Sequence, residues 1–237
     1  VTSAQLWLER RVRVIDGTTV SMPDTPVNQK KYPQPSTQKP GCGFPQMRIA
    51  GLFSLASGAL LDHAKSSIQV HESILLGRLM PALAKGDVIL ADRGFCSFRS
   101  FHKIARAGVD ALMRLNGARK VDFRKGKKLG PNDRLIEWKK PAKCPKSCTQ
   151  EEFDALPDTQ TLRHVRLIVS ARGMRTQTIT LVTTLLDPTA YPLQQLGERY
   201  FQRWSVELRF REIKITLGMD VLRCQTPAMV EKEVMMH

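Results

Sequence analysis

The sequence predicts an α/β domain with a basic, β-rich insertion ahead of a long final helix. Three observations support this. Short apolar runs alternate with helical stretches in the first half, positive charge is concentrated in residues 116–175, and polar residues share one face of the last helical stretch. The chain has 237 residues, of which 42% are hydrophobic. That is enough for a packed core in one large domain or two small ones.

The first elements predicted are a strand, a loop and a hairpin. Residues 11–22 alternate and are rich in Val and Thr, which indicates a strand that carries Asp16. Five prolines between residues 24 and 46 indicate a loop. Residues 47–68 read as two strands that turn at Ser57-Gly58.

Helices and strands then alternate. Residues 72–85 are helical in pattern, and residues 87–91 form a short apolar run suited to a buried strand. This strand delivers Asp92 at its carboxyl end. Two more elements follow: a helix capped by Ser97 that runs to about Arg106, and a strand over residues 109–115.

Residues 116–175 differ in composition. They hold 15 Lys or Arg and 7 acids, a net charge of +8 out of +15 for the whole chain. Short strand-like runs cover residues 135–139 and 162–170, without a strong helix. A chain this basic usually binds a polyanion, so we expect the insertion to face DNA. A solvated surface that binds nothing is the alternative.

The last part begins with a β-branched strand over residues 176–186 and ends with a helix over residues 193–217. At about 100° per residue, four polar side chains of this helix fall within an arc of about 60°, and Arg211 falls beside it. The four are Tyr200, Arg203, Glu207 and Lys214. Apolar residues flank this polar stripe on both sides: Phe201, Trp204 and Leu208 on one, and Val206, Phe210, Ile213 and Leu217 on the other. We therefore expect the stripe to line a cleft.

Three acids are candidates for one site: Asp16, Asp92 and Glu207. Carboxylates that converge from distant segments repel one another unless a cation lies between them. Mg²⁺ prefers such hard oxygen ligands, and two bridged ions can drive an in-line phosphoryl transfer. Each acid alone has a simpler interpretation, since Asp16 and Asp92 could be turn residues and Glu207 could pair with a neighbouring Arg.

Other classes of protein fit less well. No apolar run approaches the ~20 residues of a membrane span, and the N-terminus lacks the layout of a signal peptide. Five irregularly spaced cysteines indicate reduced thiols in a cytosol. Cys144 and Cys148, with His164 nearby, could form part of a zinc site, although their spacing is poor.

Three segments resemble the DDE transposases of bacterial insertion sequences, in the large "insertion sequence four" group. They are VIDGTTVSMPDT, VILADRGF and the helix from Tyr200 to Lys214, whose Tyr-x2-Arg-x3-Glu-x6-Lys spacing matches the family signature. The following segment, LGMDVLRCQTPAMVEKEV, also looks like family sequence. The resemblance extends over roughly residues 11–235.

The resemblance implies a ribonuclease-H-like mixed sheet flanked by helices, with the β-rich insertion before the last catalytic helix. Residues 1–115 would hold the first part of this core and both Asp motifs, residues 116–175 the insertion, and residues 176–237 the last strand and the Glu helix. Asp16, Asp92 and Glu207 would be the catalytic, metal-binding triad for Mg²⁺, for which Mn²⁺ can substitute. Four residues would hold the DNA backbone: Tyr200, Arg203, Arg211 and Lys214.

The implied activity is cleavage at transposon ends followed by strand transfer. Its partners would be double-stranded DNA and a second copy of the chain in a synaptic dimer, in the bacterial cytosol and not at a membrane. Val1 and His237 look like internal positions, so we expect a piece of a longer protein. The alternatives are a related nuclease without strand transfer, a non-catalytic DNA-binding remnant, and a zinc-containing regulator.

Overall fold

A single mixed sheet organises the chain in its computed structural model, which describes residues 6–119, 121–145, 148–169, 177–216 and 218–237. Six residues in these ranges are described by their backbone alone: Val169, Gln177, Glu207, Arg209, Glu212 and Ile213. Within the described ranges the strand order is β3-β2-β1-β4-β5-β9-β8-β7-β6. The β1–β4 and β4–β5 pairs are parallel and the other neighbours are antiparallel.

The strands have these bounds: β1 Val12–Ser21, β2 Gln46–Ser54, β3 Leu60–Ser67, β4 Val88–Ala91, β5 Asp110–Arg114, β6 Lys127–Gly130, β7 Asp133–Lys139, β8 Thr159–Val169 and β9 Gln177–Thr183. The α-helices have these: α1 Pro26–Lys31, α2 Glu72–Leu79, α3 Phe98–Arg106, α4 Gln150–Asp154, α5 Leu193–Gln202, α6 Trp204–Arg211 and α7 Pro227–Met236. The predicted class, a mixed α/β sheet flanked by helices, is confirmed.

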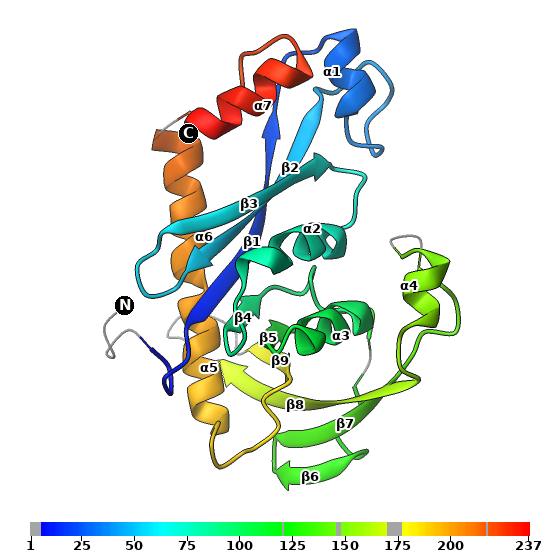
Figure 1. Cartoon of the computed structure of the whole chain (residues 1–237), viewed down its shortest axis with the longest axis vertical. Helices are drawn as coiled ribbons and strands as arrows, with labels where there is room; N and C mark the ends of the chain where they lie inside the picture. The colour runs from blue at the N-terminus through cyan, green and yellow to red at the C-terminus, as the bar shows by residue number, and fades with distance from the viewer. Residues whose placement is uncertain (1–5, 120, 146–147, 170–176, 217) are drawn as a thin grey trace.

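Helices cover both faces of the sheet (Figure 1). On one face α2 and α3 pack on side chains such as Ile15, Ile89 and Ala91. On the other face α5 and α6 pack on the side chains that alternate with these along the strands, such as Val14 and Leu90. Both faces of β4 are therefore buried, which explains why its sequence is a continuous apolar run rather than an alternating one. A third cluster joins α7 to the far ends of β1 and β2.

Two predicted segments differ from the structure in their secondary structure. The predicted loop over residues 24–46 contains α1, because Thr25 accepts a hydrogen bond from the Asn28 amide and Pro26 occupies the first helical turn. The helix predicted over residues 72–85 ends at Leu79 and continues only as a 3₁₀ turn, since Pro81 removes a backbone donor.

The final helix is present over nearly its predicted length, but it is not a continuous α-helix. The α5 helix ends at Gln202, α6 begins at Trp204, and Glu212–Thr216 forms a π-helical segment. Its i→i+5 bonds change the angle per residue, so Lys214 departs from the angle that an ideal α-helix gives it.

The basic insertion continues the core sheet, because β9 pairs with β5 on one side and with β8 on the other. Within it, Arg163 is fully buried and binds Asp133 through Nε at 2.9 Å and Nη2 at 2.5 Å. Its Nη1 donates to three carbonyls in the segment before α5, those of Leu185, Asp187 and Tyr191. This cation therefore joins the insertion to the start of the last helix, and it does not face solvent.

Replacing Arg163 with Met will destabilise the fold strongly, because Asp133 is left buried without its partner. The expected loss is about 3–5 kcal/mol in the free energy of unfolding. Urea denaturation followed by circular dichroism measures it. In the double variant Arg163→Met/Asp133→Leu the loss should be smaller, since no charge then remains buried. Equal loss in the two variants would contradict the importance of the ion pair.

A buried aromatic pair lies in the same insertion. The Trp138 indole N–H donates to Nε2 of His164 at 2.7 Å, and both side chains are buried. The Arg119 guanidinium stacks on Trp138, 3.9 Å from the ring centroid. Burial, and then the charge of Arg119, lower the pKa of His164 to about 4. The imidazole is therefore neutral in the folded protein at physiological pH.

Stability should fall on mild acidification because of His164. An unfolded histidine takes up a proton below about pH 6.5, whereas the folded one does so only near pH 4, so this contribution is lost as pH falls between those values. The loss is on the order of 3 kcal/mol over that range. Urea midpoints measured from pH 7 to pH 4.5 test it. The His164→Gln variant keeps an acceptor for Trp138 but does not titrate, so an unchanged pH slope in this variant would refute the assignment.

Candidate active site

Two acids of the sequence motifs meet where the parallel pairing of β1 with β4 ends. In the parallel ladder Ile15 of β1 pairs with Ala91 of β4, so the next residues, Asp16 and Asp92, stand side by side. Ile15 and Ala91 face the α2/α3 layer. Side chains alternate along a strand, so Asp16 faces the other layer, which contains α5 and α6. Both acids therefore lie at the carboxyl end of a parallel strand pair, where ligand sites of α/β sheets occur.

Two residues of the helix signature contact these acids. The Tyr200 hydroxyl donates to Oδ1 of Asp92 at 3.4 Å. The Arg203 Nη1 lies 3.6 Å from Oδ2 of Asp16, and its guanidinium lies 5.6 Å from the Tyr200 ring centroid. Both side chains are buried, with 2% and 4% exposed. Each carboxylate of the pair is thus held by a residue from the last helix.

Burial decides the protonation state of Tyr200, against the opposing charges of Arg203 and Arg114. Burial, ahead of all other causes, raises the pKa of Tyr200. The hydroxyl therefore stays protonated and remains a donor to Asp92. Arg203 places a positive charge beside Asp16, which offsets the repulsion between two neighbouring carboxylates.

The other two cations predicted to bind DNA lie further along the helix. Arg211 and Lys214 line a cleft of about 470 Å³ together with Asp16 and Gly17. Arg211 is exposed and Lys214 is half-buried. The cleft also contains Asp220, so its two cations stand between two acids, and Arg211 and Lys214 are the side chains in it that could bind a phosphate.

The expected apolar walls of this stripe are unequal. Val206 and Phe210 are buried, and the Phe210 ring packs edge-on against Phe53 at 5.0 Å between centroids. Trp204 and Leu208, on the other side, are 58% and 57% exposed. Phe201, on the same side as these two, is half-buried against the core, so the predicted enclosure is right for Val206 and Phe210, partly right for Phe201, and wrong for Trp204 and Leu208. The side chain of Ile213 and all of Leu217 lie outside the described residues.

Glu207 lies on α6, one turn after Arg203, and its side chain is outside the described residues. Among the side chains that are described, no group of three His, Cys, Asp or Glu is placed to hold a metal ion. Two of the three predicted ligands, Asp16 and Asp92, nevertheless stand together. Carboxylate oxygens are the donors that Mg²⁺ prefers, so this pair fits a divalent ion.

Sequence reasoning missed Arg114. It ends β5 and follows Met113, which pairs with Ala91, so Arg114 lies next to Asp92 at the same end of the parallel strands. Its charge acts on Tyr200, where it lowers the pKa against the larger effect of burial. The signal was available, because a strand over residues 109–115 was predicted and parallel strands end at a common edge.

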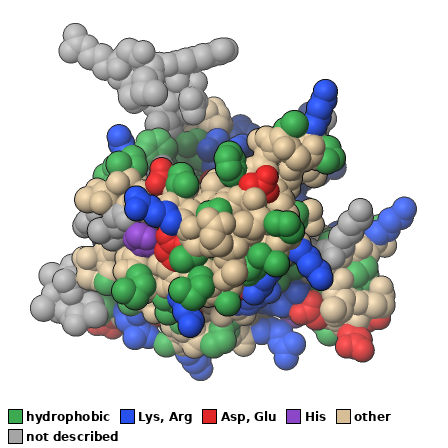
Figure 2. Space-filling view, turned by 90° about the horizontal axis from the view of Figure 1, so that it is seen from above, with side chains coloured by type: hydrophobic (Ala, Val, Ile, Leu, Met, Phe, Trp, Pro, Cys, Tyr) green, Lys and Arg blue, Asp and Glu red, His purple; other side chains and the backbone are tan. Residues whose placement is uncertain are grey.

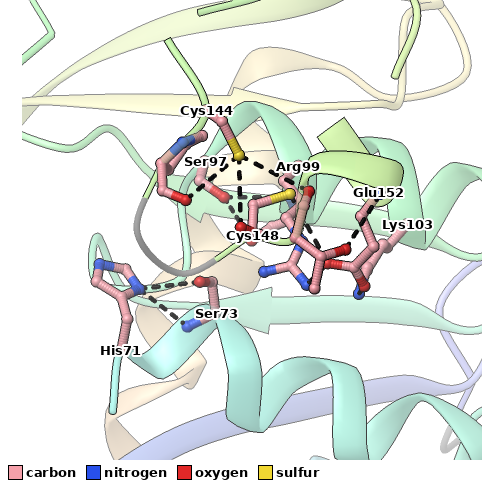
Figure 3. Close-up of polar contacts among 11 residues, drawn as sticks. His71, Ser73, Ser97, Arg99, Lys103, Cys144, Cys148 and Glu152 are labelled. Atoms are coloured by element: carbon pink, nitrogen blue, oxygen red, sulfur yellow. Dashed lines mark hydrogen bonds and ion pairs between the residues drawn. The ribbon is translucent and has the colours of Figure 1, made fainter. Parts of the chain in front are cut away.

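The alternative zinc site is not assembled. His164 accepts from Trp138 inside the insertion. The Cys144 Sγ approaches the Cys148 carbonyl, and the Cys148 Sγ lies 3.7 Å from Glu152 (Figure 3). The same view shows His71 engaged with Ser73, away from the sulfurs. These contacts are local caps and turns, and among the described residues they do not form a metal centre.

The basic charge is spread over the molecular surface. Figure 2 looks onto the end that carries α1 and α7, where Lys and Arg side chains lie at several places around the outline. In the insertion some cations have structural partners, since Arg166 stacks on Phe123 at 4.0 Å and Arg134 donates to the Phe123 carbonyl. Lys120, Lys146, Arg172 and Arg175 lie outside the described residues. In the described part of the chain, none of the helices has the length and apolar character that a membrane span requires.

Comparison with known proteins gives consistent results. A model of the transposase DDE domain matches residues 7–237. The transposase InsG for insertion sequence element IS4 of Escherichia coli (strain K12) is 26% identical over 230 residues, which are 96% of this chain and 50% of that protein. The chain thus spans about half the length of this curated relative.

A solved structure shares the fold. The piggyBac transposase in a synaptic complex with hairpin DNA aligns with a TM-score of 0.55 at 11% identity, over 94% of this chain and 44% of that one. This agrees with the predicted ribonuclease-H-like arrangement of the sheet. Because the family model matches residues 7–237 and the three sequence motifs agree with it, the chain belongs to the transposase DDE domain family, in the insertion sequence four group.

Proposed function

We propose that this chain is the catalytic core of a DNA transposase. It would cut a DNA strand at the end of a mobile element, and the released 3′-hydroxyl would then attack a target phosphodiester. The observation that carries the proposal is the side-by-side placement of Asp16 and Asp92 against Tyr200 and Arg203. The relative InsG is named a transposase, which supports the same activity.

Asp16, Asp92 and Glu207 are the proposed metal ligands, for Mg²⁺ or for Mn²⁺ in its place. Such ions, when bound, would activate the attacking oxygen and stabilise the leaving one. Tyr200 and Arg203 hold the two aspartates in position through the contacts described above. Neither Tyr200 nor any serine is needed as a nucleophile in this chemistry.

The DNA backbone would lie along the cleft that Arg211 and Lys214 line. Arg203 lies beside Asp16, which lines the same cleft, and Arg114 adds a cation beside Asp92. The proposed partners are therefore double-stranded DNA, both transposon ends and target, and a second copy of the chain in a synaptic dimer. We place this activity in the bacterial cytosol.

Nicking of supercoiled plasmid with Mg²⁺ or Mn²⁺ tests the proposal directly. The Asp92→Asn variant keeps the shape of the side chain and an acceptor for Tyr200 but loses the charge, so metal-dependent nicking should fall by roughly 10³-fold or more. DNA binding, followed by gel retardation of the same samples, should persist. Asp154→Asn, at an exposed acid on α4, is the matched control and should nick as the wild type does.

Each outcome of this assay has a meaning. Nicking that survives in Asp92→Asn would overturn the assignment of the site. DNA binding by wild type and variant with nicking by neither would favour a DNA-binding piece without catalysis. Nicking without joined products, in a reaction supplied with transposon ends and target, would favour a nuclease that does not transfer strands.

Arg114 is expected to contact a phosphate. Replacing it with Ala should reduce the slope of log Kd against log salt by about 1 and weaken binding similarly for all DNA sequences. Fluorescence anisotropy with a labelled duplex at several NaCl concentrations measures the slope. Arg106→Ala removes an exposed cation at the far end of α3, beyond the opposite end of β5, and should leave the slope unchanged. Identical slopes for Arg114→Ala and wild type would exclude the contact.

A further inference from the structure

Glu72, the first residue of α2, lies against the glycines that follow both metal-site aspartates. A Cβ built on Gly94 would lie 1.7 Å from Glu72 Oε2, a distance that real side chains do not adopt. A Cβ built on Gly17 would lie 3.8 Å from Glu72 Oε1. One carboxylate thus reaches the segment after Asp92 with one oxygen and the segment after Asp16 with the other.

A side chain at residue 94 would displace the Glu72 carboxylate. Gly94 has no positive φ, so its backbone conformation is open to any residue. A side chain at this position would meet the Glu72 carboxylate, which is the end of a flexible side chain, and would push it aside. Gly94 of the Asp-Arg-Gly motif thus lets Glu72, 22 positions earlier in the chain, lie close to its backbone.

Both partners of this contact are held rigidly. Leu75, Leu76 and Leu79 fix α2 in the core with none of their surface exposed, and His71 caps its first turn. On the other side, Phe95 is buried and its amide donates to the Asp92 carbonyl at 3.1 Å, which closes the turn. The backbones on both sides of the contact are therefore fixed, and the half-buried Glu72 side chain fills the space between them.

A ligand role for Glu72 does not fit the geometry. Gly17 lies on the α2 side of β1, whereas Asp16 faces α5 and α6, so the Glu72 carboxylate stands behind the pair of acids. Of the described acids, no three are placed to share one metal ion. No ion pair joins Glu72 to another residue that the structure describes.

We propose that Glu72 is a positioning residue for the metal site, whose carboxylate, by filling the space between Gly17 and Gly94, sets the relative position of Asp16 and Asp92. The proposal rests on the proposed function, because it takes these two aspartates as metal ligands. Residues that orient metal ligands from outside the coordination shell typically change metal affinity by about 10–100-fold when they are replaced.

Mn²⁺ binding to the purified chain, measured by calorimetry and by electron paramagnetic resonance without DNA, tests the proposal independently of activity. The Glu72→Ala variant should bind Mn²⁺ about 10-fold more weakly than wild type, with a similar melting temperature. Glu72→Gln keeps the shape of the side chain, so its Mn²⁺ affinity should stay close to that of the wild type. Glu151→Ala removes an acid from the first turn of α4 and serves as the matched control.

A second pair of variants tests the contact itself. Gly94→Ala should weaken Mn²⁺ binding, since its methyl group displaces the Glu72 carboxylate, and Gly94→Ala/Glu72→Ala should recover part of the affinity because the methyl then has room. A double variant no better than Gly94→Ala would overturn the proposal. An equal loss of Mn²⁺ affinity in Glu72→Gln and Glu72→Ala would also overturn the proposal, because the charge of Glu72 and not its shape would then determine the affinity.

The reference variant Asp92→Asn separates this inference from the proposed function. If Asp92→Asn binds Mn²⁺ as tightly as the wild type does, the assignment of Asp92 as a metal ligand is refuted. If Asp92→Asn loses binding while Glu72→Ala matches wild type, the metal site stands and the role of Glu72 is refuted.

Discussion

The parallel register between β1 and β4 is the constraint on which the site depends. Because Ile15 pairs with Ala91, two like charges, Asp16 and Asp92, are forced together where this parallel pairing ends. A slip of one residue would turn one of them to the opposite face. The surrounding structure supports this register from both sides: α2 and α3 bury one face of β4, and α5 and α6 bury the other. Tyr200 and Arg203 then stabilise an arrangement that repulsion alone would disfavour.

Much of this arrangement could be predicted from the sequence. The strand over residues 87–91 was predicted because it is uniformly apolar, and that pattern follows from burial on both faces. Asp92 could be placed at the end of this strand, and the polar residues of the last helix could be placed on a common face. The contacts of Tyr200 and Arg203 with the two aspartates were not predicted, because the resemblance implied DNA contacts for these two residues instead.

The rest depended on tertiary contacts that no local pattern encodes. Gly94 is typical of a turn glycine, and no local pattern shows that Glu72 approaches its backbone from another layer. Arg163 reads as one of many surface cations, but it is buried with Asp133. The outer apolar flank of the helix stripe was expected to be core because hydrophobicity alone does not tell which face meets a neighbour, and Trp204 is exposed.

The pairing of β9 with both β5 and β8 has a mechanical consequence. The insertion is not a separate body on a hinge, since its strands and the strand that delivers Asp92 share one ladder of backbone hydrogen bonds. Arg163 adds a direct connection from this ladder to the segment that leads into α5. A force applied to the outer strands therefore reaches the two aspartates and the helix above them through covalent and hydrogen-bonded paths, as a shear of the whole sheet.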